Sequence, residues 1–384
     1  MTAPVLDIDA LLDDRDVRIL VCCGSGGVGK TTTAASLAVR AAERGRDVVV
    51  LTIDPARRLA QSMGLTELDN TPRVVEGIDT SAGGSLEAMM LDMKRTFDEI
   101  VLDHSDAERA QQILDNPFYQ SLSSSMAGTQ EYMAMEKLGQ LRRNPAWDLI
   151  VVDTPPSRSA LDFLDAPKRL GSFLDGRVIR ILAAPAKAGG RGMFKVVTAG
   201  FNIVTNVITK VLGAQLLKDV SAFITALDTM FGGFRERADA TYKLLKNPET
   251  RFLVVAAPEP DALREASYFV ERLSEERMPL AGLVLNRVHR SAAGSLTASR
   301  CLAAAEDLNG GDGADGADDP GRIAAGLLRL HADRMNVIAR EQRLTARFTG
   351  AHPGVAVGTV QALPGDVHDL DALRSIGSDL SAAG

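Results

Sequence analysis

A glycine-rich stretch near the start of the chain holds the residues best suited to chemistry. From Gly24 to Thr31 the sequence fits G-x-x-x-x-G-K-[ST], a phosphate-binding motif that joins a strand to a helix. Glycines let backbone N–H groups approach phosphate oxygens, and the following helix directs its positive dipole end at the same anion. A lysine at a helix N-terminus, here Lys30, is unfavourable unless an anion lies beside it. The pattern predicts a site for nucleotide phosphates.

The motif gives each residue of this loop a role. Lys30 is expected to bridge the β- and γ-phosphates, and the Thr31 hydroxyl is expected to ligate Mg²⁺. The nucleotide contacts are expected from Gly26, Gly27, Val28, Gly29, Lys30, Thr31 and Thr32. A nucleoside triphosphate and Mg²⁺ are therefore the predicted ligands of the loop. The alternative is a glycine-rich strand–helix turn that binds nothing, which the presence of Lys30 disfavours.

Two aspartates end apolar runs that read as buried parallel strands. Residues 17–23, 47–54 and 148–153 form such runs, and a helix-forming segment follows the first of them. Ligands in parallel sheets lie beyond the carboxyl ends of the strands. We therefore expect Asp54 and Asp153 to lie beside the glycine-rich loop.

Helical patterning fills much of the remaining sequence. Residues 86–145 and 168–246 are predicted to form helical insertions that make up an α-helical subdomain. Three functions of residues 168–246 are left open. They could pack on their own domain, bind an apolar client or partner, or contact a membrane surface. Residues 306–322 are rich in Gly and Asp and predict a flexible acidic loop. Residues 1–384 as a whole read as one α/β domain with these insertions.

Composition excludes several classes of protein. Hydrophobic residues make up 45% and charged residues 24% of the 384 residues, as in ordinary globular proteins. The net charge of −7 opposes a nucleic-acid-binding role, which needs clustered Lys and Arg. Three cysteines, two of them adjacent, make no disulfide framework and favour a reducing compartment. The acidic start of the chain and the lack of a long apolar stretch predict a cytoplasmic protein without a spanning helix.

These motifs together resemble the family of ArsA and the Get-type ATPases that target tail-anchored membrane proteins, a branch of the deviant Walker A, SIMIBI-class P-loop NTPases. "GSGGVGKTT" from Gly24 is similar to the family's G-K-G-G-V-G-K-T-T. "DPARRLAQSMG" from Asp54 resembles its switch I, and "DTPPSRSALDFL" from Asp153 resembles its switch II. The resemblance covers most of the chain and implies a doubly wound, mostly parallel sheet flanked by helices.

The resemblance also implies roles for residues outside the loop. Asp54 would orient or activate the attacking water, and Asp153 would hold Mg²⁺ through a water molecule. Asn286 and Arg287 match the family's adenine-reading pair, and Pro364 resembles the loop that covers the base.

The function implied is an ATP-hydrolysing dimeric switch that couples the nucleotide state to an apolar client or a membrane-associated partner. A peripheral location at the membrane is left open. Ser25 stands where the family has a lysine that reaches across the dimer to the partner's phosphates. A homodimer would therefore hydrolyse ATP slowly, and a heterodimer with a related, lysine-bearing P-loop ATPase would supply the missing cation. A low-turnover nucleotide-binding regulatory subunit is the corresponding alternative.

Two further alternatives depend on features that the sequence largely lacks. An arsenite or anion efflux-pump ATPase needs spaced cysteines and usually two P-loop halves, whereas this chain has one P-loop. Because no C-x-x-C pair is present, zinc is not expected either. Positioning ATPases of the ParA or MinD type are disfavoured by the net charge and by the acidic C-terminal sequence.

Overall fold

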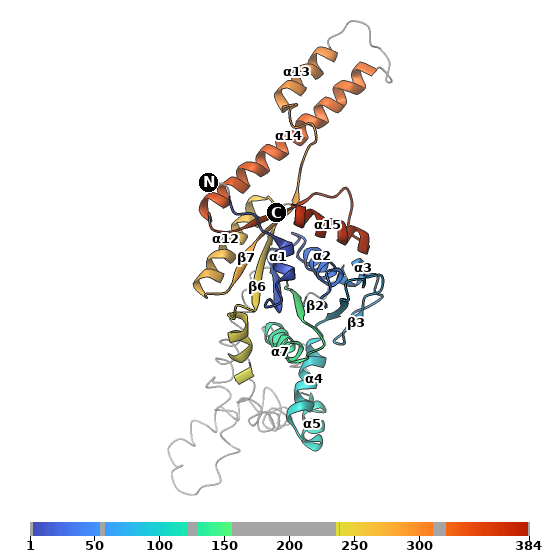
Figure 1. Cartoon of the computed structure of the whole chain (residues 1–384), viewed down its shortest axis with the longest axis vertical. Coiled ribbons are helices and arrows are strands. Elements are labelled where there is room, and N and C mark those ends of the chain that lie inside the picture. Colours follow the sequence, from blue (N-terminus) through green and yellow to red (C-terminus); the bar gives the residue numbers. More distant parts are fainter. Residues whose placement is uncertain are drawn as a thin grey trace, which may run out of the picture.

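An eight-stranded sheet lies at the centre of the protein (Figure 1). The structure, a computed structural model, describes residues 3–53, 58–117, 119–120, 129–155, 236–237, 239–309 and 320–382. The strands are β1 (Ile19–Cys23), β2 (Asp47–Thr52), β3 (Arg73–Val74), β4 (Ser85–Met90), β5 (Leu149–Asp153), β6 (Thr250–Ala256), β7 (Leu280–Val288) and β8 (Val357–Gln361). Their order is β3-β4-β2-β5-β1-β6-β7-β8, and every neighbouring pair is parallel except β3–β4.

Helices flank this sheet. In the described ranges they are α1 (Ile8–Asp13), α2 (Lys30–Glu43), α3 (Arg58–Ser62), α4 (Met93–His104), α5 (Ala107–Leu114), α7 (Thr129–Arg143), α12 (Pro260–Glu275), α13 (Ala298–Asn309), α14 (Pro320–Ala351) and α15 (Leu370–Ala382). The mostly parallel sheet with flanking helices confirms the predicted α/β P-loop fold class.

The central strands are buried along their whole length. Every residue of β1 and of β5 is buried, which explains why these segments read as continuous apolar runs rather than alternating ones. β1 lies between β5 and β6, and Cys22 is in register with Asp153. The carboxyl ends of β1 and β5 therefore stand level, and the glycine-rich loop emerges beside Asp153.

Residues 86–90 correct the predicted boundary of the first helical insertion. They belong to β4, which pairs in parallel with β2, Val48 opposite Leu86. Leu, Glu, Ala and Met favour helix, but pairing with a buried strand overrides that local preference. The helical part begins at Met93 and comprises α4, α5 and α7.

The other two predicted segments fall largely outside the described residues. Of the insertion at 168–246, residues 168–235 and 238 are not described. The predicted acidic loop at 306–322 is too wide, because 306–309 complete α13 and 320–322 begin α14. Residues 310–319 lie outside the described ranges.

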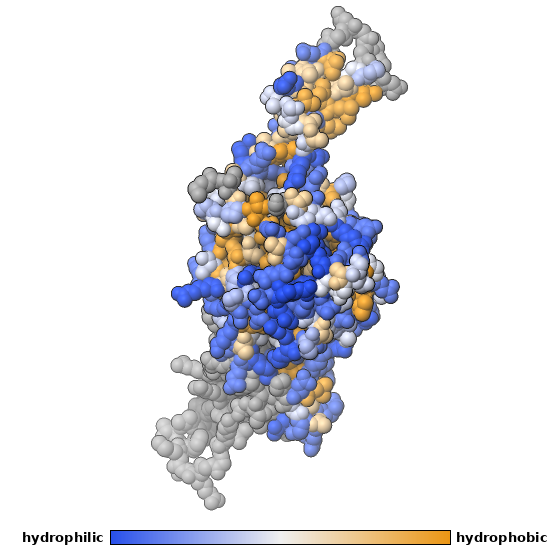
Figure 2. All heavy atoms as spheres, viewed as in Figure 1, coloured by the Kyte–Doolittle hydropathy of each residue, from blue (hydrophilic) through white to orange (hydrophobic). Residues whose placement is uncertain are grey.

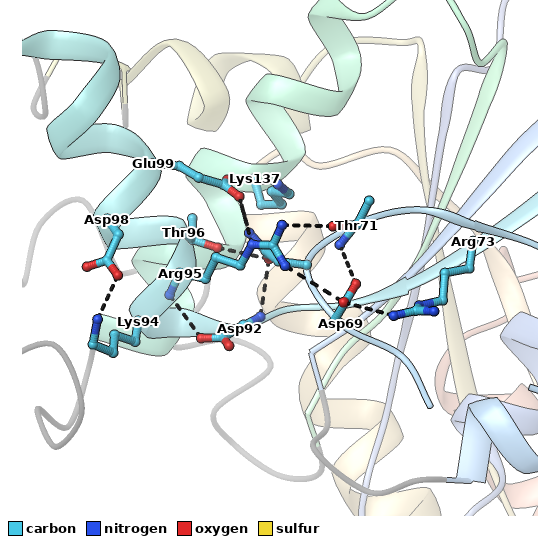
Figure 3. A network of polar contacts seen from close by, with 11 residues as sticks. Asp69, Thr71, Arg73, Asp92, Lys94, Arg95, Thr96, Asp98, Glu99 and Lys137 are labelled. Carbon is cyan, nitrogen blue, oxygen red and sulfur yellow. Dashed lines mark hydrogen bonds and ion pairs between the residues drawn. The ribbon is translucent and has the colours of Figure 1, made fainter. Parts of the chain in front are cut away.

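A buried polar network attaches α4 and α7 to the edge of the sheet (Figure 3). Asn70 is its centre: its Oδ1 accepts from the Asp92 backbone N–H at 3.2 Å and from the Thr96 hydroxyl at 3.1 Å. Its Nδ2 donates to Glu99 at 3.0 Å, and Glu99 pairs with Lys137 of α7 at 3.0 Å. Because Asn70 and Thr96 are buried, losing either partner would leave polar groups unsatisfied. The network therefore fixes the start of α4 relative to β4.

Helices α13 and α14 project from the body as an antiparallel pair (Figure 1). In the view of Figure 2 their surface carries a concentration of apolar side chains, whereas the body beneath is mostly hydrophilic. None of the helices in the described ranges is long and apolar enough to cross a membrane.

Candidate functional site

The loop between β1 and α2 can be built only with glycine at key positions. Gly24 has φ +151°, and a Cβ there would lie 2.1 Å from the Val255 carbonyl oxygen of β6. Gly27 and Gly29 also have positive φ values of +77° and +91°, and Gly29 is the N-cap of α2. The backbone is thus shaped into a turn with its amides at a helix N-terminus, a geometry suited to an anion.

Lys30 is the first residue of α2 and is buried, with 6% of its surface exposed. Its Nζ donates to the Ser25 carbonyl oxygen at 2.8 Å, so the side chain folds back over the loop. A buried ammonium at the positive end of a helix dipole is stabilised when an anion joins it. This placement fits the predicted contact with phosphates.

The Thr31 hydroxyl and the Asp153 carboxylate meet at the base of the loop. Thr31 Oγ1 donates to Asp153 Oδ2 at 2.8 Å, and Thr52 Oγ1 at the end of β2 donates to the same oxygen at 2.9 Å. Asp153 is fully buried. One hydroxyl and one carboxylate beside a phosphate site are the donor set that P-loop proteins use for Mg²⁺ together with phosphate oxygens and waters. The residues therefore fit a magnesium ion delivered with a nucleotide.

A cavity of about 540 Å³ adjoins the loop, and the predicted base-binding residues line it. Its lining includes Gly29 and Thr32 from the loop and α2, Asn286 and Arg287 from the end of β7, and Pro364 after β8. The structure thus brings together residues that are far apart in the sequence.

Asn286 also supports the loop itself. Its Nδ2 donates to the Val28 carbonyl oxygen at 2.8 Å, and its Oδ1 accepts from the Arg287 backbone N–H at 2.9 Å. A Cβ at Gly29 would lie 2.1 Å from the same Nδ2. In this structure the Asn286 amide fixes the position of the phosphate-binding loop, a role that the sequence did not indicate.

His289 and Glu341 form a second contact that sequence reasoning did not find. His289 lines the cavity, and its Nδ1 lies 2.6 Å from Glu341 Oε1. Its backbone N–H donates to Glu341 Oε2 at 2.9 Å. Glu341 belongs to the projecting helix α14 and is buried, so this pair joins that helix to the cavity.

Asp54 lies outside the described residues, as do residues 55–57. Its predicted role in activating water stays a prediction. β2 ends at Thr52, and Thr52 shares an oxygen of Asp153 with Thr31. The chain therefore approaches the site two residues before Asp54.

The adjacent cysteines are poor metal ligands. Burial, more than the neighbouring Asp153, raises the pKa of Cys22 well above its usual value, and burial raises the pKa of Cys23 to about 12. At neutral pH both are thiols, whereas zinc binds thiolates. In the described ranges, no group of three or more His, Cys, Asp or Glu side chains is arranged to hold a metal ion.

Comparisons with known proteins agree with this geometry. The family model described as "Anion-transporting ATPase" matches residues 17–303, a range that contains the glycine-rich loop, Asp153 and Asn286. The chain belongs to the anion-transporting ATPase family. The prediction of the family and of ATPase activity is thereby confirmed.

Fungal ATPases are among the curated relatives of this chain. It is 26% identical to ATPase get3 of Schizosaccharomyces japonicus over 73% of this chain and 78% of the relative. It is 26% identical to ATPase get3 of Schizosaccharomyces pombe over 73% of this chain and 76% of the relative. It is 25% identical to ATPase get3 of Neurospora crassa, again over 73% of this chain and 76% of the relative. Pro364 and the whole of α14 lie beyond the residues that the family model matches.

Proposed function

We propose that this ATPase is one subunit of a dimeric nucleotide switch, in which the state of the bound nucleotide controls an apolar client or a membrane-associated partner. The observation that carries the proposal is the hydrogen bond between Thr31 and Asp153 beyond the carboxyl ends of adjacent parallel strands, with Lys30 folded over the loop beside it. P-loop switches respond to the γ-phosphate and its Mg²⁺ through residues at these positions.

In this proposal the loop from Gly26 to Thr32 binds the phosphates through backbone amides, and Lys30 neutralises their charge. Thr31 contributes a direct oxygen to Mg²⁺ and Asp153 acts through a water molecule. A magnesium ion held by these two residues would supply positive charge beside the phosphates. Asp54 orients the attacking water, while Asn286, Arg287 and Pro364 contact the base.

Coupling to the helical subdomain is supported by the connection from β2 to α4. β2 ends beside Asp153, β4 pairs with β2, and the Asn70 network fixes α4 at the end of β4. Movement of the segment after β2 would be transmitted to α4 and α7 through these contacts. The insertion at 168–246 is proposed as the client-contacting part, with a peripheral position at the membrane when the client is a membrane protein.

Ser25 points to a heterodimer with a related, lysine-bearing P-loop subunit. A cation supplied across an interface is worth about 10³ or more in the rate of phosphoryl transfer. The test compares ATP turnover and mass for the chain alone, for Ser25→Lys, and for the chain mixed with such a subunit. We expect slow turnover alone and a marked rise in both other cases. Fast, cooperative turnover of the chain alone that Ser25→Lys leaves unchanged would contradict the heterodimer.

The same residue favours a second candidate, a regulatory subunit that binds nucleotide with little turnover. The Asp54→Asn variant distinguishes this regulatory subunit from the nucleotide switch. If the chain is a switch, this variant keeps nucleotide affinity and loses turnover. If the chain is a regulatory subunit, turnover in the mixed complex is the same with and without the substitution.

A further inference from the structure

Helix α14 has two parts with different surroundings. Towards its C-terminal end it packs on the body, where Glu341 and Phe348 are buried and Leu344 contacts the main core. Towards its N-terminal end it runs away from the body and packs against α13 (Figure 1). The contact between the two helices buries small residues that are not part of the main core, namely Cys301, Ala305, Ala325 and Ala332.

One face of α14 carries a regular row of side chains. Positions spaced alternately by four and three residues are Ile323, Leu327, Leu330, Arg334, Val337, Glu341, Leu344 and Phe348. This is the a/d spacing of a coiled-coil seam. The alanines at 325 and 332 stand at the f position of the same heptads, which is the opposite side of the helix. α13 therefore covers the back of the seam and leaves its front open.

The half of the seam on the projecting part is exposed. Ile323 is 54%, Leu327 62%, Leu330 68% and Val337 41% exposed. We call these four residues the open seam. At its body end the same row continues into Leu344 and Phe348, which line a groove of about 300 Å³ between α12 and α14. The open seam is thus the continuation of a helix-packing face that the body uses.

Helix α14, which carries the open seam, is basic. Arg329, Arg340, Arg343 and Arg347 are exposed, and none of them makes an ion pair or hydrogen bond within the part of the chain that the structure describes. The acidic residues of α14 are Asp333 and Glu341, and Glu341 is engaged by His289. By the same heptads Arg340 and Arg347 stand at g, Arg329 and Arg343 stand at c, and Asp333 is at the g position between Leu330 and Val337. α14 as a whole has six arginines against two acidic residues, whereas the net charge of the chain is −7.

We propose that the open seam of α14 binds an amphipathic helix of a partner protein, with an apolar row at the same spacing and acidic residues at its flanks. The a/d spacing selects a helix, because knobs from a facing helix fill the gaps between seam residues. The arginines select acidic flanks.

Other occupants fit less well. A second copy would place arginine rows against each other, which like-charge repulsion opposes. A membrane surface takes a broad apolar face, whereas the g positions beside the open seam are Gly326 and the acidic Asp333. Nucleic acid would meet isoleucine and leucine where phosphate contacts are needed.

The test uses two labelled peptides of about three heptads with Leu at a and d. One has Glu at e and g, the other has Lys, and both are used below the concentration at which they self-associate. Fluorescence anisotropy with the full chain is expected to show micromolar binding of the Glu peptide, at least about tenfold tighter than that of the Lys peptide. Similar affinities for both peptides, or no binding of the Glu peptide, would overturn the proposal.

Variants locate the binding surface. Leu327→Asp combined with Leu330→Asp is expected to abolish binding of the Glu peptide, and Arg329→Glu combined with Arg340→Glu is expected to reverse the peptide preference. Val74→Asp, at a residue of the body that is 64% exposed, is the matched control and should bind as the natural chain does. All three variants should keep ATP turnover, because every changed side chain is already exposed.

Two further results would identify a different occupant and overturn the proposal. The first is a concentration-dependent increase in mass, by analytical ultracentrifugation, that the Leu327 and Leu330 variant abolishes. The second is cosedimentation with phosphatidylserine vesicles that the same variant abolishes.

Discussion

The phosphate-binding loop and the projecting α13–α14 pair are built on opposite principles. In the loop, Gly24 has no space for a Cβ, Lys30 is buried, and the Thr31 and Asp153 side chains bond to each other. In the projecting pair, Gly326 has no neighbour within 4 Å of a built Cβ, and leucines and arginines of α14 face solvent. The first arrangement is suited to holding a small anion in a fixed geometry, and the second leaves a long surface exposed. Substitutions should therefore have large effects in the loop and small effects on α14 outside its contacts.

The largest expected difference between the two regions is in catalysis. Asp153→Asn removes the carboxylate that we place behind Mg²⁺, and turnover should fall by about 10³-fold, or about 4 kcal/mol in activation free energy. Asp333→Asn, an acid-to-amide change on α14, should leave turnover unaltered. Phosphate release at saturating Mg·ATP measures both. Equal turnover in the two variants would remove Asp153 from the site.

The next largest difference between the two regions is expected in the free energy of unfolding. A Cβ at Gly24 would lie 2.1 Å from the Val255 carbonyl oxygen, so Gly24→Ala must displace β6 or the loop. We expect a loss of about 3 kcal/mol in the free energy of unfolding. Urea unfolding followed by circular dichroism measures the change. A loss below about 0.5 kcal/mol would show that the loop is less constrained than the structure indicates.

Glu341 lies where α14 meets the cavity beside the loop, and its removal should have an intermediate effect. Glu341→Ala removes the carboxylate that accepts from the part-buried His289 backbone N–H, and loss of a hydrogen bond to a charged group costs about 1–3 kcal/mol. Arg343→Ala, two residues further along α14, should change stability by less than about 0.5 kcal/mol. Thermal unfolding gives both values, and hydrogen exchange should show faster opening at the end of β7 in the first variant. Equal changes in stability for the two variants would mean that the contact between His289 and Glu341 does not join α14 to the cavity.

The smallest effect is expected within the projecting pair. Gly326 is inside α14 with nothing near a built Cβ, so Gly326→Ala should stabilise the helix by about 0.5–1 kcal/mol. Slower hydrogen exchange of α14 amides would show this gain. A destabilised α14 would indicate that close packing, not open space, surrounds this residue.

Much of the site could be predicted because it consists of local patterns at strand ends. β1, β2 and β5 are buried on both faces and read as apolar runs, and parallel sheets bring their carboxyl ends together. Lys30, Thr31 and Asp153 followed from this arrangement. The contact between His289 and Glu341 could not be predicted, because it joins residues 52 positions apart through tertiary packing alone.

Two elements were misread or missed for different reasons. Residues 86–90 have helix-forming side chains, and only their pairing with β2 makes them a strand. The length of α14 was detectable: alternating spacings of four and three from Ile323 to Phe348, with alanines every seventh residue, indicate a long helix with two packing faces.

Binding of Mg·ATP to the Lys30→Ala variant tests the central claim most directly. Isothermal titration calorimetry should show affinity at least about 100-fold below that of the natural chain, or about 2.7 kcal/mol. Lys94→Ala, at an exposed lysine of α4 paired with Asp98, is the control and should bind as the natural chain does. Affinities within about twofold of each other for all three proteins would contradict the assignment of the Gly24–Thr31 loop as the nucleotide site.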